Sequence, residues 1–294
     1  MTRNFIDEQN LENFISEQGK FLFTDASYRI YVEKHLVNAI HFPNTIFRNT
    51  GFNSSNVCKN NGLIPLQNID SDCISQLFNN CGLSIDDRIC VYGGQDDDVY
   101  GCLFVYYQLF KFGFKNIYVL NCDWTKLPEK YLTRDFPFWY KSNNKYNITS
   151  LDFDPDDVVK ISKNPHFNIL DVRPPTDYRG ETSVWQGKGH LPSAYNLFWK
   201  DVLVKDPVTG KATQKFIPIS EIRKKIKPFN FDPYNTVCCY CNTGSEGALM
   251  FFVFKILLEW DGPVKLFEKS FGNYQYLNSL SPEKFPIVLG PNRF

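Results

Sequence analysis

The feature that most limits the possible folds of this 294-residue chain is a repeat of its own pattern. Apolar segments of strand length and of helix length recur in the second half in the order of the first. The matched segments are 21–25 with 167–171, 35–42 with 189–196, 89–92 with 237–240, 100–112 with 248–260, and 117–120 with 264–267. The offset between matched segments is about 146 to 154 residues, which indicates an internal duplication.

Within each copy, strand-like and helix-like segments alternate. This order is typical of a mainly parallel sheet with helices on both faces. The chain is also longer than one common domain. We therefore expect an α/β protein with two tandem domains, at residues 1–140 and 151–294. Residues 141–150, which are rich in Asn and Lys, are expected to form the linker.

The charges of the chain argue against two classes of partner. Lys and Arg together number 32, as do Asp and Glu, so the net charge gives no attraction to nucleic acid or to an acidic membrane surface. The N-terminal sequence lacks the apolar core of a signal peptide, and Lys255 and Glu259 interrupt the longest apolar run. We expect a soluble cytoplasmic protein with no nucleic-acid and no membrane partner.

The nine cysteines lie in apolar contexts without a regular spacing, which indicates reduced thiols rather than a disulfide framework. No Cys-x-x-Cys pair occurs, and the four histidines do not complete a zinc pattern. We therefore expect no structural metal site.

One cysteine begins a tight loop between a predicted strand and a predicted helix. Residues 236–240 have the composition of a short buried strand, and residues 247–260 are almost wholly apolar. Cys241 would face the helix N-terminus and a curl of backbone N–H groups, both of which favour the nucleophilic thiolate. A free Cys is more often a small buried hydrophobe, but this setting makes Cys241 the candidate nucleophile.

The rest of the loop is predicted to bind the substrate. Gly244 and Gly247 let the backbone curl around an anion, and two hydroxyl side chains add donors. The candidates are Asn242, Thr243, Gly244, Ser245, Glu246 and Gly247. In the first copy, Gly93 falls at the position of Cys241, so only the second copy keeps a nucleophile.

These residues resemble the two-domain rhodanese-like sulfurtransferases, the family of thiosulfate and 3-mercaptopyruvate sulfurtransferases. The resemblance covers essentially the whole chain. Its pieces are Asp-Val-Arg at 171–173, Asp-Tyr-Arg-Gly at 177–180, Gly-His-Leu-Pro at 189–192, the Cys241 loop and residues 271–276, with weaker counterparts at 25–27, 35–42 and 119–124. It implies two rhodanese-like domains, of which the C-terminal one is catalytic.

The resemblance also implies a reaction that requires no cofactor. The Cys241 thiolate would take a sulfane sulfur from 3-mercaptopyruvate or thiosulfate, become a persulfide, and pass the sulfur to a small thiol, cyanide or a thioredoxin-like protein. Amides of the loop would stabilise the persulfide anion.

Two arginines that precede the loop are candidates to bind the donor's carboxylate or sulfonate through paired N–H groups. Arg179 is one of them. Arg173 is the other, but it directly follows Asp171, and a structural ion pair between these two is an open alternative. Asp171 and His190 are interpreted as supports of a strand end and a turn.

The charged residues in and near this loop differ from those typical of the family. Family loops that read Cys-Gly-Ser-Gly-Val-Thr are typical of mercaptopyruvate enzymes, whereas this loop reads Cys-Asn-Thr-Gly-Ser-Glu. Glu246 should oppose thiolate formation, and Asp177 stands where many of these enzymes have a basic residue. Because the loop lacks basic residues that would suit doubly charged thiosulfate, 3-mercaptopyruvate is the favoured donor.

Other functions stay open. The main alternative is a catalytically weak rhodanese-like module that binds a partner or senses sulfur, which the two atypical acids motivate. A dual-specificity phosphatase would need an Arg six residues after Cys241, where Gly247 stands. A cysteine hydrolase would need a base near Cys241, and the four histidines lie mostly at positions that suggest structural roles.

Overall fold

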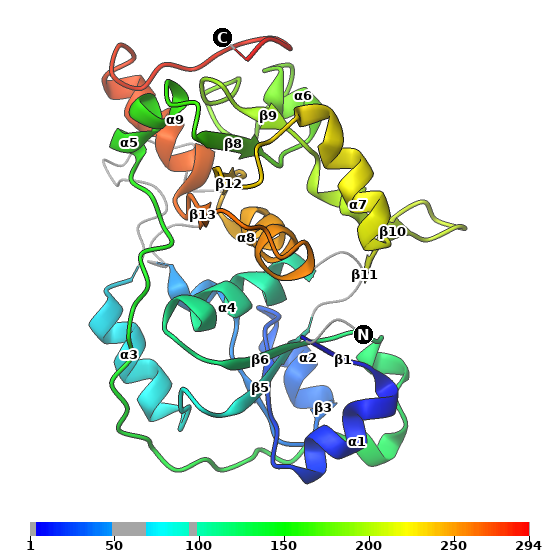
Figure 1. Cartoon of the computed structure of the whole chain (residues 1–294). Coiled ribbons are helices and arrows are strands. Elements are labelled where there is room, and N and C mark those ends of the chain that lie inside the picture. The colour runs from blue at the N-terminus through cyan, green and yellow to red at the C-terminus, as the bar shows by residue number, and fades with distance from the viewer. Residues whose placement is uncertain (1–3, 49–68, 94–98, 294) are drawn as a thin grey trace. The chain divides into compact units, whose positions relative to one another are not determined.

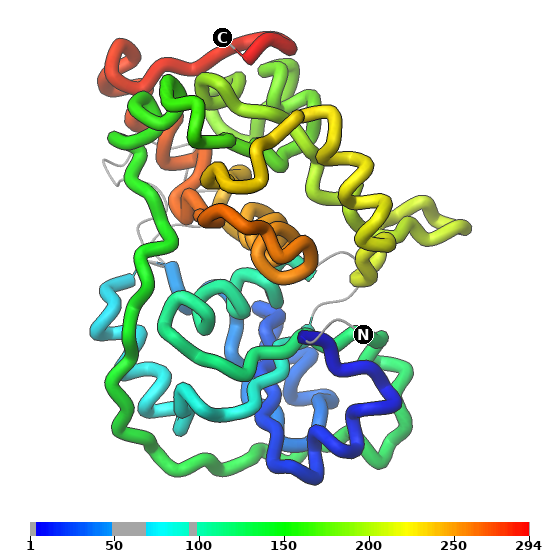
Figure 2. The backbone as a smooth tube through the Cα atoms, viewed as in Figure 1, coloured from blue at the N-terminus to red at the C-terminus, as the bar shows by residue number. Residues whose placement is uncertain are grey.

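The computed structural model describes residues 4–48, 69–93 and 99–293 (Figures 1 and 2). These residues form two compact units. The first unit contains the chain up to Phe47, Ile69–Thr149 and Asp206–Lys215. The second contains Arg48, Ser150–Lys205 and the chain from Phe216 onward.

The first unit is built on a five-stranded parallel sheet with the order β1-β6-β5-β2-β4. Its strands are β1 (Phe5–Ile6), β2 (Lys20–Phe23), β4 (Ala39–His41), β5 (Arg88–Tyr92) and β6 (Asn116–Leu120), and β3 (His35–Leu36) pairs antiparallel with β7 (Leu132–Thr133). Its helices are α1 (Glu8–Ser16), α2 (Tyr28–Glu33), α3 (Ser71–Asn80) and α4 (Val99–Lys111), with 3-10 turns at Asn44–Phe47, Trp124–Lys126 and Glu129–Tyr131.

Alternate side chains along these strands face different helices, as strand geometry requires. One hydrophobic cluster joins Phe21 and Phe23 of β2 to Phe14 of α1 and Tyr31 of α2. On the other face, α4 contacts β5 and β6, and Phe78 of α3 packs against the aromatic rings that follow α4. The sheet is therefore covered on both faces (Figure 1).

The second unit repeats this plan with a four-stranded parallel sheet in the order β13-β12-β8-β9. Its strands are β8 (Phe167–Asp171), β9 (Tyr195–Asn196), β12 (Thr236–Tyr240) and β13 (Val264–Leu266). Outside the two large sheets, β10 (Leu203–Lys205) pairs with β11 (Ala212–Phe216). Its helices are α5 (Pro155–Ser162), α6 (Pro175–Tyr178), α7 (Ile219–Ile226), α8 (Ser245–Phe252) and α9 (Ser270–Leu280), with 3-10 turns at Trp199–Val202 and Lys227–Phe229.

Two helices of the second unit pack on opposite faces of its sheet. Ile169 of β8, Cys238 and Tyr240 of β12 and Phe271 of α9 belong to one hydrophobic cluster. On the other face, α8 lies so close to the sheet that a Cβ on Gly247 would be 2.7 Å from a Leu266 side-chain carbon. The predicted α/β fold, with mainly parallel sheets flanked by helices, is confirmed.

The structure changes two details of the sequence interpretation. β2 ends at Phe23, which lies beside Tyr92, and Asp171 lies beside Tyr240 in the same way. Phe23, rather than Asp25, is therefore the counterpart of Asp171. The helix expected at residues 247–260 begins earlier, at Ser245, and continues past Phe252 as a π-helical turn over Val253–Leu257.

The segment predicted to be a linker is fixed to the first unit by hydrogen bonds, although it forms no helix or strand. The hydroxyl of Ser142 donates to Asn79 Oδ1 at 2.9 Å, and that of Tyr146 donates to the Leu83 carbonyl oxygen at 2.9 Å. The Tyr146 ring also stacks on Phe114 at 5.5 Å between centroids. Figure 2 shows this segment in green as an extended strip of chain.

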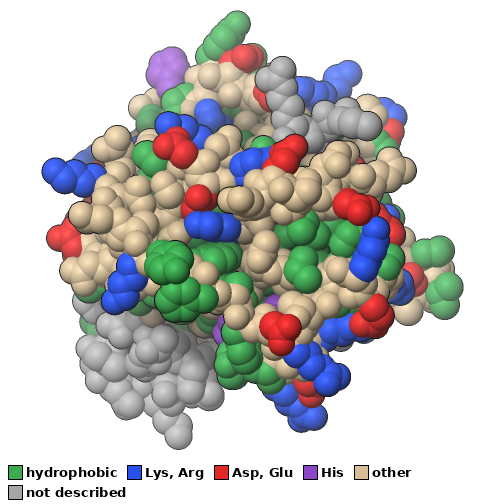
Figure 3. All heavy atoms as spheres, turned by 90° about the horizontal axis from the view of Figure 1, so that it is seen from below, with side chains coloured by type: hydrophobic (Ala, Val, Ile, Leu, Met, Phe, Trp, Pro, Cys, Tyr) green, Lys and Arg blue, Asp and Glu red, His purple; other side chains and the backbone are tan. Residues whose placement is uncertain are grey.

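Three general properties bear on function. In the part of the chain that the structure describes, no helix is long and apolar enough to cross a membrane. The same residues contain no cluster of side chains suited to a metal ion, and their cysteines are free thiols. The face drawn in Figure 3 carries basic and acidic side chains interspersed with apolar ones.

Candidate active site

Cys241 lies immediately beyond the carboxyl end of β12, one of the two inner strands of the second unit's sheet, and its side chain is buried, with 1 % exposed. The loop that it begins is held by the start of α9. The amide N–H groups of Phe271 and Gly272 donate to the carbonyl oxygens of Cys241 and Asn242, each at 3.0 Å. The Cys241 amide donates to Ser270 Oγ at 3.2 Å. The backbone of Cys241 is therefore held at both its amide N–H and its carbonyl oxygen by the start of α9.

A glycine directs a backbone donor at the sulfur. Gly244 adopts a φ of +96°, which favours glycine, and its N–H donates to Cys241 Sγ at 2.9 Å. A Cβ at this position would also lie 2.3 Å from the Glu268 carbonyl oxygen. The amides of Thr243 and Gly247 also lower the pKa of the thiol by hydrogen bonding. The loop has the anion-binding geometry that the sequence predicted.

Burial and Glu246 both raise the pKa of the Cys241 thiol, and together they outweigh the loop amides, which lower it. The pKa of the Cys241 thiol is raised above its usual range, first because the thiol is buried and second because the negative charge of Glu246 opposes ionisation of the thiol. The sequence indicated that the loop and the helix terminus favour the thiolate and that Glu246 opposes it, and in the resting protein burial and Glu246 outweigh the loop amides. Glu246 stands in the first turn of α8, where the helix favours a negative charge.

Arg48 also supports the loop, and the sequence analysis missed it. Its Nη2 donates to the carbonyl oxygens of Thr243 and Glu268, at 2.6 and 3.0 Å. Because it is 195 residues away in sequence from Thr243, no motif around Cys241 could have indicated it. Its guanidinium ties the loop to the segment that precedes α9.

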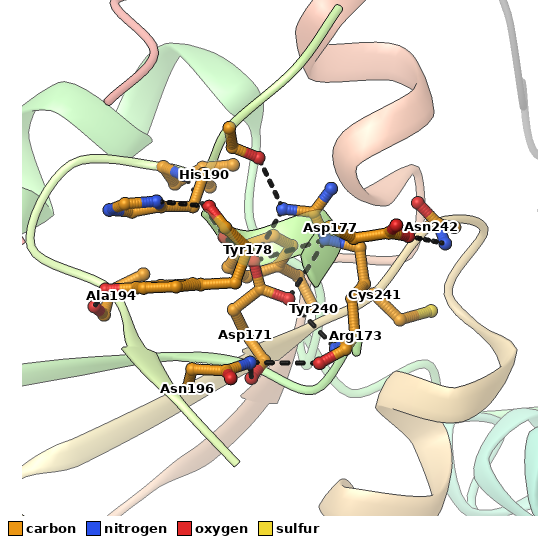
Figure 4. A network of polar contacts seen from close by, with 12 residues as sticks. Asp171, Arg173, Asp177, Tyr178, His190, Ala194, Asn196, Tyr240, Cys241 and Asn242 are labelled. Carbon is orange, nitrogen blue, oxygen red and sulfur yellow. Dashed lines mark hydrogen bonds and ion pairs between the residues drawn. The ribbon is translucent and has the colours of Figure 1, made fainter. Parts of the chain in front are cut away.

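Arg173 is buried in the core of the second unit, and its predicted role in donor binding stays a prediction. Only 1 % of its side chain is exposed, and Nε and Nη2 both donate to the carboxylate of Asp171, at 2.6 Å for Nη2. Nη2 also donates to the Gly189 carbonyl oxygen at 2.7 Å, and the guanidinium lies over the Phe271 ring. This is the structural ion pair that the sequence left open, and Figure 4 shows it within its network.

Arg179 lies at the surface. Its guanidinium forms an ion pair with Glu181, with Nε 2.6 Å from Oε1, and 36 % of its side chain is exposed. The predicted role of Arg179 in donor binding therefore stays a prediction. The residue that reaches the loop from this segment is Asp177, whose Oδ2 accepts a long hydrogen bond of 3.4 Å from Asn242 Nδ2 (Figure 4).

The remaining predicted residues lie around the sulfur or support the site. Asn242, Thr243 and Ser245 are half-buried. His190 stacks on Tyr178, and its Nδ1 contacts the Tyr178 carbonyl oxygen at 2.7 Å. Burial lowers the pKa of His190, which suits the supporting role expected for it.

The comparisons with known proteins agree with this geometry. The sequence profile of the Rhodanese-like domain matches residues 154–276. A putative thiosulfate sulfurtransferase of Synechococcus elongatus is 27% identical over 292 residues, which cover 96% of this chain and 83% of the relative. A thiosulfate sulfurtransferase of Corynebacterium glutamicum is 24% identical over 76% of this chain and 73% of its own.

Solved structures show the same fold over nearly the whole chain. The 3-mercaptopyruvate sulfotransferase SseA of Escherichia coli superposes with a TM-score of 0.71 at 15% identity, over 91% of this chain and 98% of its own. The chain therefore contains a Rhodanese-like domain at residues 154–276, and over most of its length it is similar in sequence to thiosulfate sulfurtransferases and in fold to a two-domain rhodanese-type enzyme.

Proposed function

We propose that this protein transfers sulfane sulfur through a persulfide on Cys241. One observation carries the proposal: a thiol at the end of an inner strand, with a backbone N–H aimed at its sulfur from 2.9 Å, at the start of a helix. That donor is placed to stabilise a negatively charged sulfur, as an oxyanion hole stabilises oxygen. The names of the relatives support the same chemistry.

The reaction has two steps through one covalent form of the protein. In the first, the Cys241 thiolate attacks the outer sulfur of thiosulfate, the bond between the two sulfurs breaks, and sulfite leaves. With 3-mercaptopyruvate, the thiolate attacks the sulfur of the donor, the carbon–sulfur bond breaks, and its electron pair leaves on the enolate of pyruvate, which takes up a proton. In the second, a small thiol, cyanide or a thioredoxin-like protein takes the sulfur and Cys241 leaves as a thiolate. Ping-pong kinetics should follow.

Among donors, we propose 3-mercaptopyruvate ahead of thiosulfate. Glu246 lies beside the sulfur, and Asp177 approaches the loop through Asn242. Two carboxylates near the nucleophile should repel a doubly charged donor more strongly than a singly charged one.

The intact mass of the protein tests this proposal. After incubation with either donor, we expect a gain of about one sulfur atom, which cyanide removes. Cys241→Ser should gain none, whereas Cys73→Ser should gain as much as the wild type, because Cys73 is an exposed thiol outside the loop. A folded protein that gains no sulfur from either donor would refute the proposal.

A second candidate is a rhodanese-like module that binds a partner without robust turnover. The raised pKa of the Cys241 thiol and its burial favour this candidate, because both reduce the fraction of reactive thiolate. The same mass measurement separates the two, because the binding module requires no sulfur on Cys241.

A further inference from the structure

The carboxyl of Glu246 lies beside the reactive sulfur and is only partly satisfied by the protein. Its charge acts on the Cys241 thiol and helps to raise the pKa of that thiol. Its Oε2 atom is buried and has no hydrogen-bond partner among the described residues. A buried carboxylate oxygen without a donor is unfavourable. A ligand with an N–H group close to its own sulfur would supply that donor.

The three described arginines near the loop form ion pairs or hydrogen bonds with other groups of the protein. Arg173 and Arg179 are each paired with a carboxylate in their own segment. Arg48 donates to backbone carbonyl oxygens of the loop and of the segment before α9. Asp177 adds a second carboxylate through Asn242. Among the described residues, the charge that acts most strongly on the sulfur is that of Glu246, and it favours a cationic ligand.

We propose that Glu246 selects a cationic aminothiol as the sulfur acceptor, meaning a small molecule with an ammonium group two carbon atoms from its thiol. The inference rests on the proposed sulfur-transfer function. Thiosulfate and 3-mercaptopyruvate carry no N–H group, so neither donor could satisfy Oε2 in this way. An ammonium group on the acceptor would bind Glu246 and hold the adjacent sulfur near the persulfide of Cys241.

The transfer balances without an added oxidant or reductant. The sulfur of the aminothiol attacks the outer sulfur of the persulfide, and a new bond forms between these two atoms. The bond from the outer sulfur to Cys241 breaks, and its electron pair leaves on Cys241 as a thiolate. The thiol proton of the acceptor ends on the outer sulfur, so the product is the persulfide of the aminothiol.

The test isolates the second half-reaction. The full chain is loaded with sulfur from whichever donor loads it, freed of the donor, and mixed with cysteamine, 2-mercaptoethanol or 3-mercaptopropionate. These thiols are similar in size. Apart from the thiol, cysteamine carries one positive charge, 2-mercaptoethanol carries none and 3-mercaptopropionate carries one negative charge. The rate at which the extra mass disappears is measured for the wild type and for Glu246→Gln. Dividing the wild-type rate by the variant rate for each thiol removes the thiol's own reactivity.

We expect this quotient to be about tenfold larger for cysteamine than for 3-mercaptopropionate, because the substitution removes one charge close to the ammonium. High salt should reduce the difference. Glu221→Gln is the matched control, since Glu221 is a surface carboxylate on α7 paired with Lys224, and it should leave all three quotients near one.

The outcomes separate the two ideas. Equal quotients for the three thiols, with sulfur loading intact, would refute selection by Glu246 and leave sulfur transfer standing. Failure of the wild type to load sulfur would refute the proposed function, and this inference with it.

Discussion

The two copies of the repeat keep the same aromatic and polar support around their sheets. A Tyr and a His stack in each copy, with ring centroids 4.1 Å apart in the first and 3.7 Å apart in the second. In both, the His Nδ1 contacts the Tyr carbonyl oxygen at 2.7 Å. The tyrosine that ends β5 or β12 accepts a backbone N–H, at 3.0 and 3.1 Å. The matched residues are Tyr31 with Tyr178, His35 with His190 and Tyr92 with Tyr240.

The copies differ where the strands end. In the second copy, the Tyr240 hydroxyl donates to Asp171 at 2.5 Å, and Asp171 pairs with Arg173. In the first copy, Phe23 occupies the place of Asp171, and its ring lies 5.3 Å from that of Tyr92. The fold thus tolerates either an aromatic contact or a buried ion pair at this position. The ion pair occurs in the copy that carries the candidate nucleophile.

The largest effect on stability is expected at that ion pair. Asp171→Asn leaves the buried Arg173 without its counter-charge and should lower the free energy of unfolding of the second unit by about 3–5 kcal/mol. Hydrogen exchange at β8 and β12, compared with β2 and β5, would measure it unit by unit. Asp25→Asn in the first copy should cost less than about 1 kcal/mol.

A cost below about 1 kcal/mol for Asp171→Asn would show that the ion pair is as dispensable as the comparison with Phe23 suggests. The double variant Asp171→Asn with Arg173→Met should recover part of the loss, because it removes both charges.

The next largest effect is expected on the rate of sulfur loading, which should fall when the glycine of the second copy is replaced but not when that of the first copy is. Gly244→Ala places a Cβ 2.3 Å from a carbonyl oxygen and disturbs the N–H that contacts Cys241, so the rate of sulfur loading should fall by about a hundredfold. Gly93→Ala is also strained, because φ is +142° and the Cβ would lie 2.9 Å from the Asp25 amide nitrogen. It should affect stability and leave the loading rate nearly unchanged. Equal loss of rate in both variants would mean that strain, rather than the amide contact, is responsible.

A smaller effect concerns pH. The thiolate is the reactive form, so the loading rate should rise with pH, and a raised pKa places that rise at higher pH. Glu246→Gln removes one cause of the raised pKa, so the rise should move to lower pH and loading at neutral pH should become faster. Stopped-flow or quenched mass measurements across pH would show this. An unchanged profile would mean that burial alone sets the pKa of Cys241.

The smallest effects should be equal in the two copies. The Tyr31 hydroxyl donates to the Ala39 carbonyl oxygen at 2.6 Å, and the Tyr178 hydroxyl donates to that of Ala194 at 2.8 Å. Replacing either tyrosine by Phe removes one buried hydrogen bond and should cost about 1 kcal/mol in its own unit. A difference of more than about 1 kcal/mol between the two variants would show that the matched geometry hides unequal energetics.

The pattern of apolar residues along the sequence was sufficient to predict the duplication, the α/β layers and the loop that begins at Cys241. Strand and helix periodicity can be recognised from residues close together in the sequence. The positions of Arg48 and of the Asp171 carboxylate depend on contacts between distant segments, which periodicity does not encode. The sequence indicated both the loop amides that favour the Cys241 thiolate and Glu246, which opposes it, but not the burial that raises the pKa of this thiol most. The loop amides follow from local sequence, whereas the burial that outweighs them is a property of the whole unit.

The hydrogen bonds that hold residues 141–150 to the first unit should make this segment less susceptible to proteolytic cleavage. Lys141 and Lys145 stand in a polar, irregular segment that resembles a natural site for trypsin. Cleavage needs the segment to detach into an extended form. Here that step must first break the hydrogen bonds of Ser142 and Tyr146 and withdraw an aromatic ring from Phe114. The two lysines should therefore resist nicking for as long as the first unit stays folded.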